Sequence, residues 1–331
     1  MRPASDLSPF IIAEIGASHN GSLERCLNLI GAAKRAGADA VKFQAFTPDT
    51  ITLNCDRPEF LIADGPWKGW RLYELYYAAQ TPRKWFPILF EVARNMDLVP
   101  FASVFSPEDC DFVMQFNPDL MKIASFEITD IPLIEHVGRA GKPLLLSTGM
   151  ATEKEIEMAI DRASEAGAED VISMCCVSSY PASASAAPLA RGMSGISDHS
   201  IGIEIPVAAT ALGAFVIEKH LTLSRKDGGL DDGFASEPHE FADMVRAVRD
   251  VYTAIHRDQG IRVDVEHHLY RRSLFVTKDI ECGEPFTSGN VRSIRPGYGL
   301  PPIELPTLLG RVAACDLAAG TPMKWRYVDE V

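Results

Sequence analysis

Gly195-Ile196-Ser197-Asp198-His199 and Phe215-Val216-Ile217-Glu218-Lys219-His220 each carry a histidine where an apolar run gives way to polar residues. Between these runs, residues 205–213 have the composition of a short helix that ends at a glycine. Together they predict strand, helix and strand, with a histidine at the carboxyl end of each strand. Neighbouring parallel strands end at the same edge of a sheet, so we expect His199 and His220 to bind one metal ion. For either histidine alone, the simpler interpretation is a residue that merely caps its strand. Their equivalent positions in successive units favour the metal site.

The joint between helix and strand recurs along the chain. A glycine ends a predicted helix just before an apolar strand at residues 36–42, 166–172 and 212–218, and more loosely at 140–146. This joint is typical of parallel α/β proteins. It predicts strands at residues 10–15, 40–43, 98–102, 121–124, 144–147, 171–176, 195–196 and 215–217. Helical patterns lie between most of them, at residues 23–35, 82–95, 107–116, 133–140 and 153–166.

The expected fold class is α/β, a (β/α)8 TIM barrel, because eight strands alternating with helices over about 250 residues match its size. A doubly wound sheet is the alternative, since the pattern does not show that the sheet closes. Residues 45–80 form an insertion after the second strand that is too long for an ordinary loop, and we expect it to be a lid or a substrate wall. A helix from Pro238 to about Arg257 ends the predicted barrel domain, residues 1–257. A polar linker, 258–270, precedes a small β-rich domain with Gly and Pro turns, 271–331.

Composition excludes several classes of function. The 331 residues carry a net charge of −13, which argues against nucleic acid or an anionic membrane as a partner. A hydrophobic content of 47% without an apolar run of membrane-spanning length or a signal sequence predicts a cytoplasmic protein. Seven cysteines without paired spacing fit a reducing compartment. Because the net charge is negative, an anionic substrate would need cationic side chains close to its binding site.

Polar side chains gather at or just after the predicted strand ends, which in a parallel barrel meet at one mouth. They are Glu14, Lys42, Gln44, Ser103, Lys122, Ser125, Glu127, Ser147, Ser178, Ser197, Asp198, His199, Glu218 and His220. Lysine is rarely buried without a partner, yet Lys42 and Lys122 both lie in strand-like runs. Two lysines with several serine hydroxyls suit a phosphate, and the histidines suit a metal. The pattern predicts metal-assisted chemistry on a phosphorylated, carbonyl-containing substrate.

The ordered motifs resemble the sialic acid synthases, which condense phosphoenolpyruvate with an N-acylated amino sugar to give a nonulosonic acid. The matching stretches are Phe10-Ile-Ile-Ala-Glu-Ile-Gly16, His19-Asn-Gly21, Ala36-Gly-Ala-Asp-Ala-Val-Lys-Phe-Gln44, Lys122-Ile-Ala-Ser125, Leu146-Ser-Thr-Gly-Met150, Ser197-Asp-His-Ser200 and Ala211-Leu-Gly-Ala-Phe-Val-Ile-Glu-Lys-His220. The tail is similar to that family's C-terminal antifreeze-like (SAF, β-clip) domain. The resemblance covers nearly the whole chain.

The resemblance implies a role for each matching residue. A divalent metal, usually Mn²⁺ with Mg²⁺ or Co²⁺ as alternatives, would bind His199 and His220, while Glu14 would activate water and Glu127 would be catalytic and contact the sugar. Phosphoenolpyruvate would be held by Lys42, Ser103, Lys122, Ser125, Ser147, Ser178 and Ser197. Ser103 is a substitute, because residues 101–106 are one residue shorter than the family stretch that carries a phosphate-binding threonine. The sugar would contact Gln44, Phe126, Tyr180, Asp231 and, from the partner subunit of a domain-swapped homodimer, Arg295.

Within this family the chain looks most like the pseudaminic acid synthases. Phe126 follows Ser125 where N-acetylneuraminate-forming members usually have glycine, and residues 228–231 also match. The implied sugar is 2,4-diacetamido-2,4,6-trideoxy-L-altrose, whose methyl and second acetamide suit apolar contacts from Phe126, Trp67, Trp70 and Tyr73. Phe126 and Trp70 as ordinary core residues is the simpler interpretation. An N-acetylneuraminate or legionaminate synthase, another phosphoenolpyruvate-condensing or aldolase barrel, and an inactive sugar-acid-binding paralogue are the alternatives.

Overall fold

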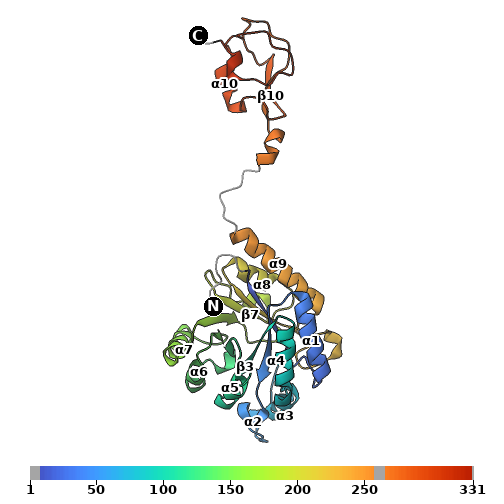
Figure 1. Ribbon diagram of the computed structural model, residues 1–331, viewed down its shortest axis with the longest axis vertical. Coiled ribbons are helices and arrows are strands. Elements are labelled where there is room, and N and C mark those ends of the chain that lie inside the picture. The colour runs from blue at the N-terminus through green and yellow to red at the C-terminus, as the bar shows by residue number, and fades with distance from the viewer. Residues whose placement is uncertain (1–7, 257–264, 330–331) are drawn as a thin grey trace. The chain divides into compact units, whose positions relative to one another are not determined.

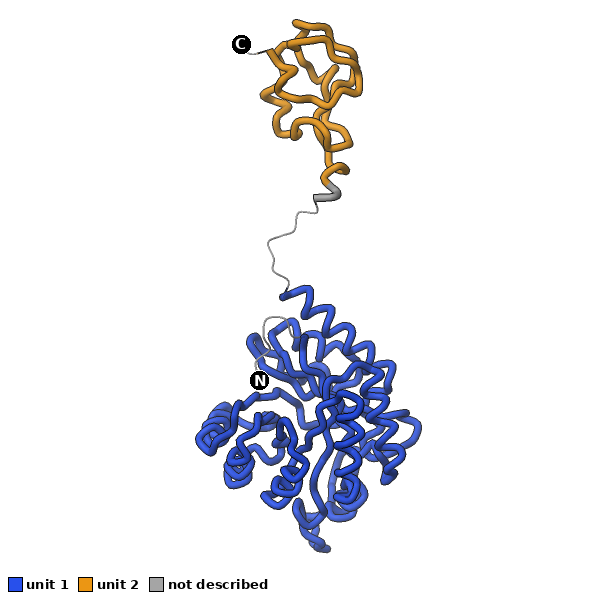
Figure 2. Tube along the Cα trace, in the orientation of Figure 1, with its two compact units in different colours: residues 1–257 blue, residues 258–331 orange. Residues whose placement is uncertain are grey.

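The computed structural model describes residues 8–256 and 265–329. The chain divides into two compact units, residues 1–257 and 258–331, each with its own hydrophobic core (Figure 2). Of the predicted linker, residues 258–264 lie outside the described residues, and Val265–Tyr270 form a 3₁₀ helix.

The first unit is a closed barrel of eight parallel strands, which confirms the predicted fold class (Figure 1). The strands are β1 (Phe10–Glu14), β2 (Ala40–Ala45), β3 (Val99–Val104), β4 (Met121–Ile123), β5 (Leu144–Ser147), β6 (Val171–Cys176), β7 (Gly195–Asp198) and β8 (Val216–His220). Each pairs with the next, and β8 pairs with β1 with Glu14 opposite His220. The pairing of β8 with β1 excludes the doubly wound alternative.

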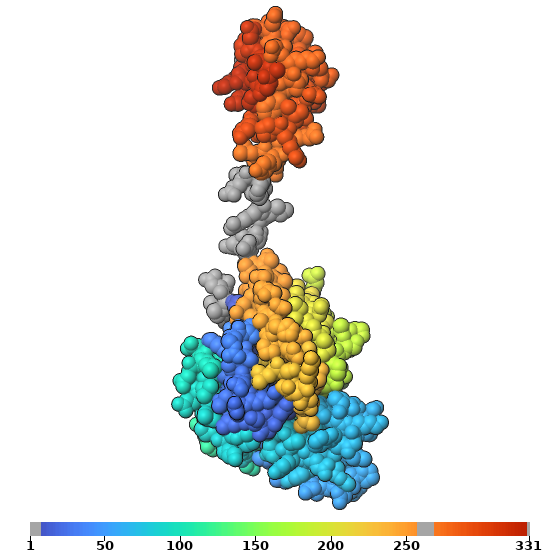
Figure 3. All heavy atoms as spheres, turned by 90° about the vertical axis from the view of Figure 1, so that its right-hand side faces the viewer, coloured from blue at the N-terminus to red at the C-terminus, as the bar shows by residue number. Residues whose placement is uncertain are grey.

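Helices surround the strands on the outside of the barrel (Figure 1). They are α1 (Leu23–Ala36), α4 (Phe86–Asn95), α5 (Pro107–Met114), α6 (Ile131–Gly138), α7 (Glu153–Ala166), α8 (Glu204–Ala211) and α9 (Pro238–His256). Local sequence sets their ends: the Ser22 side chain accepts from the Arg25 N–H at the start of α1, and Gly37 ends that helix at a φ of +90°. In the space-filling view the blue residues of α1 lie beside the yellow and orange residues of α9, with which α1 packs (Figure 3).

The insertion after β2 is helical rather than an extended loop. It contains α2 (Pro48–Ile51), the 3₁₀ helix Pro58–Phe60 and α3 (Leu72–Ala79). A further 3₁₀ turn, Arg83–Trp85, takes up the first residues of the predicted helix at 82–95. The segment therefore has the structure to act as a wall.

Two apolar layers lie on the two sides of the barrel strands. The outer layer fills the space between strands and helices. The inner layer fills the barrel with Ile12, Ala40, Phe101, Leu120, Leu145, Ile172, Met174 and Val216. Because strand side chains alternate, the residue two positions further along a strand points to the same inner side. For six of these eight residues, that next inner residue is polar: Glu14, Lys42, Ser103, Lys122, Ser147 and Glu218. The interior of the barrel is thus apolar, and polar side chains begin at its carboxyl end.

The second unit has a small antiparallel sheet of β9 (Ser273–Val276) and β10 (Val291–Ile294). Isolated bridges such as Ile280 to Leu317 and Ala313 to Val328 hold much of the remaining chain. Its other elements are the 3₁₀ helix Pro302–Glu304, α10 (Leu305–Leu308) and the 3₁₀ helix Trp325–Tyr327. Leu274, Phe286 and Met323 lie in its core. Among all described residues, no helix is long and apolar enough to cross a membrane.

Candidate active site

A buried carboxylate, Glu218, is the centre of the polar layer at the barrel mouth. The Lys122 ammonium donates to its two oxygens at 2.8 and 2.9 Å, and the Lys42 ammonium donates to Oε1 at 3.0 Å. The Ser197 hydroxyl adds a hydrogen bond of 2.8 Å. The sequence placed Glu218 at a strand end but gave it no role. Its signal was the alternation along β8, which puts Glu218 and His220 on the inner side and Lys219 on the outer side.

The charges of this cluster stabilise one another. Burial by itself raises the pKa of Glu218, but the adjacent Lys122 and Lys42 ammonium groups hold that pKa well below its usual range. Burial is the largest effect on the pKa of Lys122 and lowers it, although the neighbouring Glu218 carboxylate acts to raise it. Burial also acts to lower the pKa of Lys42, but Glu14 and Glu218 together raise it. The two lysines therefore supply positive charge inside an acidic protein, as an anionic substrate requires.

Glu14 lies beside this cluster, at the end of β1. Its Oε1 accepts from the Gln44 amide at 2.7 Å, and its Oε2 lies 3.3 Å from the Lys42 ammonium. Burial, the largest effect, raises the pKa of Glu14 despite the neighbouring Lys42. A buried carboxylate with a raised pKa is suited to proton transfer.

The predicted serines form smaller groups around the mouth. The Ser125 and Ser178 hydroxyls lie 2.7 Å apart. Gly149 makes room for Ser178, because a Cβ at that glycine would lie 2.3 Å from the Ser178 hydroxyl. Ser147 is buried at the end of β5, and Ser103 pairs in register with Lys122. Among the described residues the buried Ser103 hydroxyl has no hydrogen-bond partner, so it is available to a ligand.

The two histidines converge as their positions in the sequence predicted, with ring centroids 5.5 Å apart. His199 follows β7, and its Nδ1 lies 2.8 Å from the Val177 carbonyl, which assigns the proton to Nδ1 and leaves the Nε2 lone pair free. Burial, followed by the neighbouring His220, lowers the pKa of His199 to about 3, so the ring is neutral. His220 Nδ1 lies 3.5 Å from Asp231 Oδ2. Two converging imidazoles form a donor set that fits a divalent metal.

A cavity of about 360 Å³ lies beside His220, which forms part of its wall. Its polar lining includes Gln44, Glu127, Tyr180, His220 and Asp231, and its apolar lining comes largely from the insertion: Ile51, Ile62, Trp67, Leu72, Leu75 and Tyr76. Tyr180 packs on His199 with ring centroids 4.4 Å apart. Burial, its first cause, raises the pKa of Glu127 to about 7.

The aromatic contacts predicted for the sugar are partly corrected. Phe126 lines the cavity and is 60% exposed, and Trp70 is 39% exposed, so the interpretation of both as core residues is wrong. Trp67 lines the cavity as expected, whereas Trp70 and Tyr73 are absent from its wall, and the Tyr73 hydroxyl instead donates to Asp49. Arg295 is exposed in the second unit, directly after β10.

This arrangement defines a class of protein: a (β/α)8-barrel enzyme whose mouth carries two buried lysines and two converging histidines. Comparison with known proteins gives the family. The NeuB family model matches residues 29–259 and the SAF domain model matches residues 271–327, so the chain belongs to the NeuB family.

Relatives of this chain have related activities by name. A pseudaminic acid synthase from Campylobacter jejuni (serotype O:2) is 41% identical over 97% of this chain and 96% of the relative. An N,N′-diacetyllegionaminic acid synthase from Legionella pneumophila is 31% identical over 98% of this chain and 96% of the relative. The crystal structure of an N-acetylneuraminic acid synthetase from Leptospira borgpetersenii has a TM-score of 0.69 at 30% identity, covering 79% of this chain and 89% of that chain.

Proposed function

We propose that this chain is a pseudaminic acid synthase, which condenses phosphoenolpyruvate with 2,4-diacetamido-2,4,6-trideoxy-L-altrose and water to give pseudaminate and phosphate. The observation that carries the proposal is the 41% identity to a pseudaminic acid synthase over 97% of the chain, ten percentage points above the legionaminic acid synthase. The apolar cavity wall supports it, since a 6-deoxy sugar with two acetamido groups offers apolar groups to that wall.

In the proposed mechanism, the polar cluster at the mouth binds phosphoenolpyruvate. Lys42 and Lys122 offset its phosphate and carboxylate charges, and the hydroxyls of the five candidate serines, at positions 103, 125, 147, 178 and 197, donate hydrogen bonds to its oxygens. Because Glu218 already accepts from both lysines, their ammonium groups are fixed before the substrate arrives. The conformational entropy of the two lysine side chains is then lost during folding rather than during substrate binding.

His199 and His220 would hold the metal, with Mn²⁺ as the first choice and Mg²⁺ or Co²⁺ as alternatives. Bound there, the metal would supply Lewis acidity to the aldehyde of the open-chain sugar. The C2=C3 π electrons of phosphoenolpyruvate form the bond from C3 to the aldehyde carbon; the aldehyde C=O π bond breaks, and its oxygen takes a proton from Glu127. Water adds at the cationic C2 and gives one proton to Glu14. The C2–phosphate oxygen bond then breaks, the remaining C2 hydroxyl becomes the keto group, and its proton leaves with the phosphate.

The proposed sugar contacts are Gln44, Phe126, Tyr180 and Asp231 in one barrel and Arg295 of the partner subunit. This last part requires a domain-swapped homodimer, and it rests on the family resemblance. The proposed location is the cytoplasm. As proposed domain bounds we keep 1–257 for the synthase barrel, 258–270 for the linker and 271–331 for the SAF domain.

The test is mass spectrometry of the products formed with phosphoenolpyruvate, Mn²⁺ and a set of acylamino sugars. We expect turnover of 2,4-diacetamido-2,4,6-trideoxy-L-altrose and little or none of N-acetylmannosamine, whose extra hydroxyls would be buried without partners at a cost of about 1–3 kcal/mol each. Better use of N-acetylmannosamine, or of the diacetamido-trideoxy-mannose precursor of legionaminic acid, would assign a different sugar. No phosphate release with any sugar would support an inactive paralogue.

A further inference from the structure

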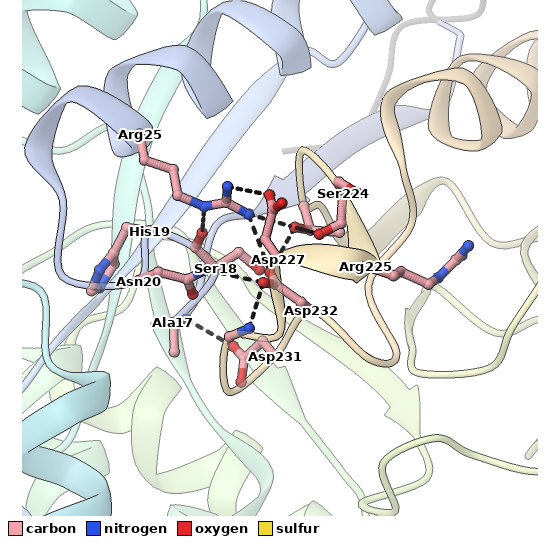
Figure 4. A network of polar contacts seen from close by, with 12 residues as sticks. Ala17, Ser18, His19, Asn20, Arg25, Ser224, Arg225, Asp227, Asp231 and Asp232 are labelled. Atoms are coloured by element: carbon pink, nitrogen blue, oxygen red, sulfur yellow. Dashed lines mark hydrogen bonds and ion pairs between the residues drawn. The ribbon is translucent and has the colours of Figure 1, made fainter.

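A network of hydrogen bonds and ion pairs joins the segment that follows β8, residues 221–232, to the loop that follows β1 and the start of α1, residues 15–25 (Figure 4). The Arg25 guanidinium is at its centre: Nε donates to the Ser18 carbonyl at 2.7 Å, and the terminal nitrogens contact Thr222, Asp227 and Asp232. The side chain of Arg25 is only 16% exposed, and that of Asp232 is fully buried. We call Arg25, Thr222 and Asp232 the brace.

Asp232 fastens the segment at further points. Its carboxylate accepts from the Thr222 hydroxyl at 2.6 Å, from the Asn20 amide at 3.0 Å and from the Gly229 N–H at 2.7 Å. The two loops fit so closely that a Cβ at Gly229 would lie 1.8 Å from the Asn20 side-chain oxygen. The position of residues 229–232 is therefore determined by the β1 loop.

The residue before Asp232 lies beside a proposed metal ligand. Asp231 Oδ2 accepts from the Ala17 N–H at 2.7 Å and lies 3.5 Å from His220 Nδ1. That ring nitrogen is buried and has no hydrogen-bond partner among the described residues. Gly16 permits the approach, because a Cβ there would lie 2.4 Å from Asp231 Oδ2 and 3.2 Å from the His220 ring. A shift of about half an ångström converts this contact into a hydrogen bond.

We infer that Asp231 is a positioning residue for His220, and that the brace holds Asp231 in place for this role. A carboxylate at Nδ1 fixes the proton on that nitrogen and directs the Nε2 lone pair at the metal, as the Val177 carbonyl does for His199. The two proposed metal-binding histidines thus differ in what orients their rings. His199 is oriented by the Val177 backbone carbonyl, and His220 by the Asp231 side chain, whose position depends on the brace. This inference rests on the proposed metal site, and it gives Asp231 a second role besides contact with the sugar.

The experiment measures the dissociation constant of Mn²⁺ alone, by electron paramagnetic resonance of the free ion, in the full-length protein without substrates. Asp231→Asn and Asp231→Ala are expected to weaken Mn²⁺ binding by about 10- to 100-fold, the range typical for partners of metal-ligating histidines. Asp232→Asn is expected to weaken it by a smaller factor, because it acts through Asp231. Asp243→Asn, in an exposed pair with Arg246 on α9, is the matched control and should leave the constant unchanged.

A second readout separates positioning from a loss of structure. Phosphoenolpyruvate binding without metal, measured by calorimetry, should stay within about twofold of wild type in Asp231→Asn, since Lys42 and Lys122 are unaltered. Unchanged Mn²⁺ affinity in a folded Asp231→Asn protein would overturn the role of Asp231, and unchanged affinity in a folded Asp232→Asn protein would overturn that of the brace. Product formation by the wild type tests the proposed function separately, because a synthase whose Asp231 variants bind Mn²⁺ normally contradicts only this inference.

Discussion

Replacing Glu218 with glutamine should destabilise the barrel strongly while leaving its shape almost unchanged. Lys42 would keep Glu14 as a partner at 3.3 Å, but Lys122 would lose the one carboxylate it contacts among the described residues. Removing one partner of a buried ion pair costs about 3–5 kcal/mol because the other charge stays buried. For a domain of this size, that is a fall in Tm of roughly 6–20 °C.

The assay is thermal and urea denaturation of wild type, Glu218→Gln and a control, Glu108→Gln. Glu108 pairs with Arg83 at the surface with its side chain 69% exposed, so its loss should cost less than about 1 kcal/mol.

The pH dependence of the stability of Glu218→Gln has a definite sign. Burial already lowers the pKa of Lys122, and losing Glu218 lowers it further. At pH values between this lowered pKa and 10.5, the ordinary pKa of lysine, the unfolded chain therefore binds more protons than the folded chain. The stability deficit of Glu218→Gln should therefore shrink as the pH rises from 7 towards 10.5.

Phosphoenolpyruvate gives the refuting comparison. If the lysines bind its anionic groups, the ligand should raise the Tm of Glu218→Gln more than that of wild type, because it supplies the missing negative charge. A Glu218→Gln protein as stable as wild type, or one that phosphoenolpyruvate stabilises no better, would refute the view that this carboxylate holds two charged lysines for the substrate.

Four further predictions concern the metal, the proton donor, the tail and a glycine. Chelator, and separately His199→Ala, should abolish turnover without changing the far-ultraviolet circular dichroism; a fully active chelated enzyme would contradict the metal site. With its pKa raised to about 7, Glu127 as proton donor predicts that kcat falls above pH 7 and that Glu127→Gln lacks this limb in a pH–rate profile. Arg295→Ala mixed with the His199 variant should regain activity, since one site of the heterodimer has both intact parts; no recovery after proven subunit exchange would leave the swapped dimer unsupported. Gly16→Ala should weaken Mn²⁺ binding, because its φ of +48° and the nearby Asp231 leave no room for a methyl group.

The sequence predicted the barrel because each helix–strand joint is local: a glycine ends the helix and an apolar run follows. It predicted the histidine pair for the same reason, since parallel strands bring equivalent positions to one edge. Strand ends were less accurate. β7 and β8 extend to Asp198 and His220, beyond the predicted 196 and 217, because Asp198 and Lys219 are buried as an ion pair on the outer side of the strands.

Other features depend on contacts between residues far apart in the chain, which the pattern of apolar and polar residues does not encode. The grouping of Lys42, Lys122 and Ser197 around Glu218 joins four different strands. The contact of Asp231 with Ala17 and His220 requires the β1 and β8 loops to meet, and local signals give no measure of that distance. The choice of Trp67 rather than Trp70 for the cavity wall likewise depends on the fold of the insertion.

β8 presents Glu218 and His220 on its inner side, two residues apart along one strand. Two residues of a strand span about 6.6 Å, a distance fixed by backbone geometry. The separation between the lysine cluster and the His220 imidazole, which lines the cavity, is therefore part of the barrel itself, whereas much of the apolar wall belongs to an insertion outside it. Substitutions in the insertion can change which sugar fits without moving the groups that carry the chemistry. A barrel of this design is a suitable starting point for evolving or engineering synthases that accept new sugars with one unchanged reaction.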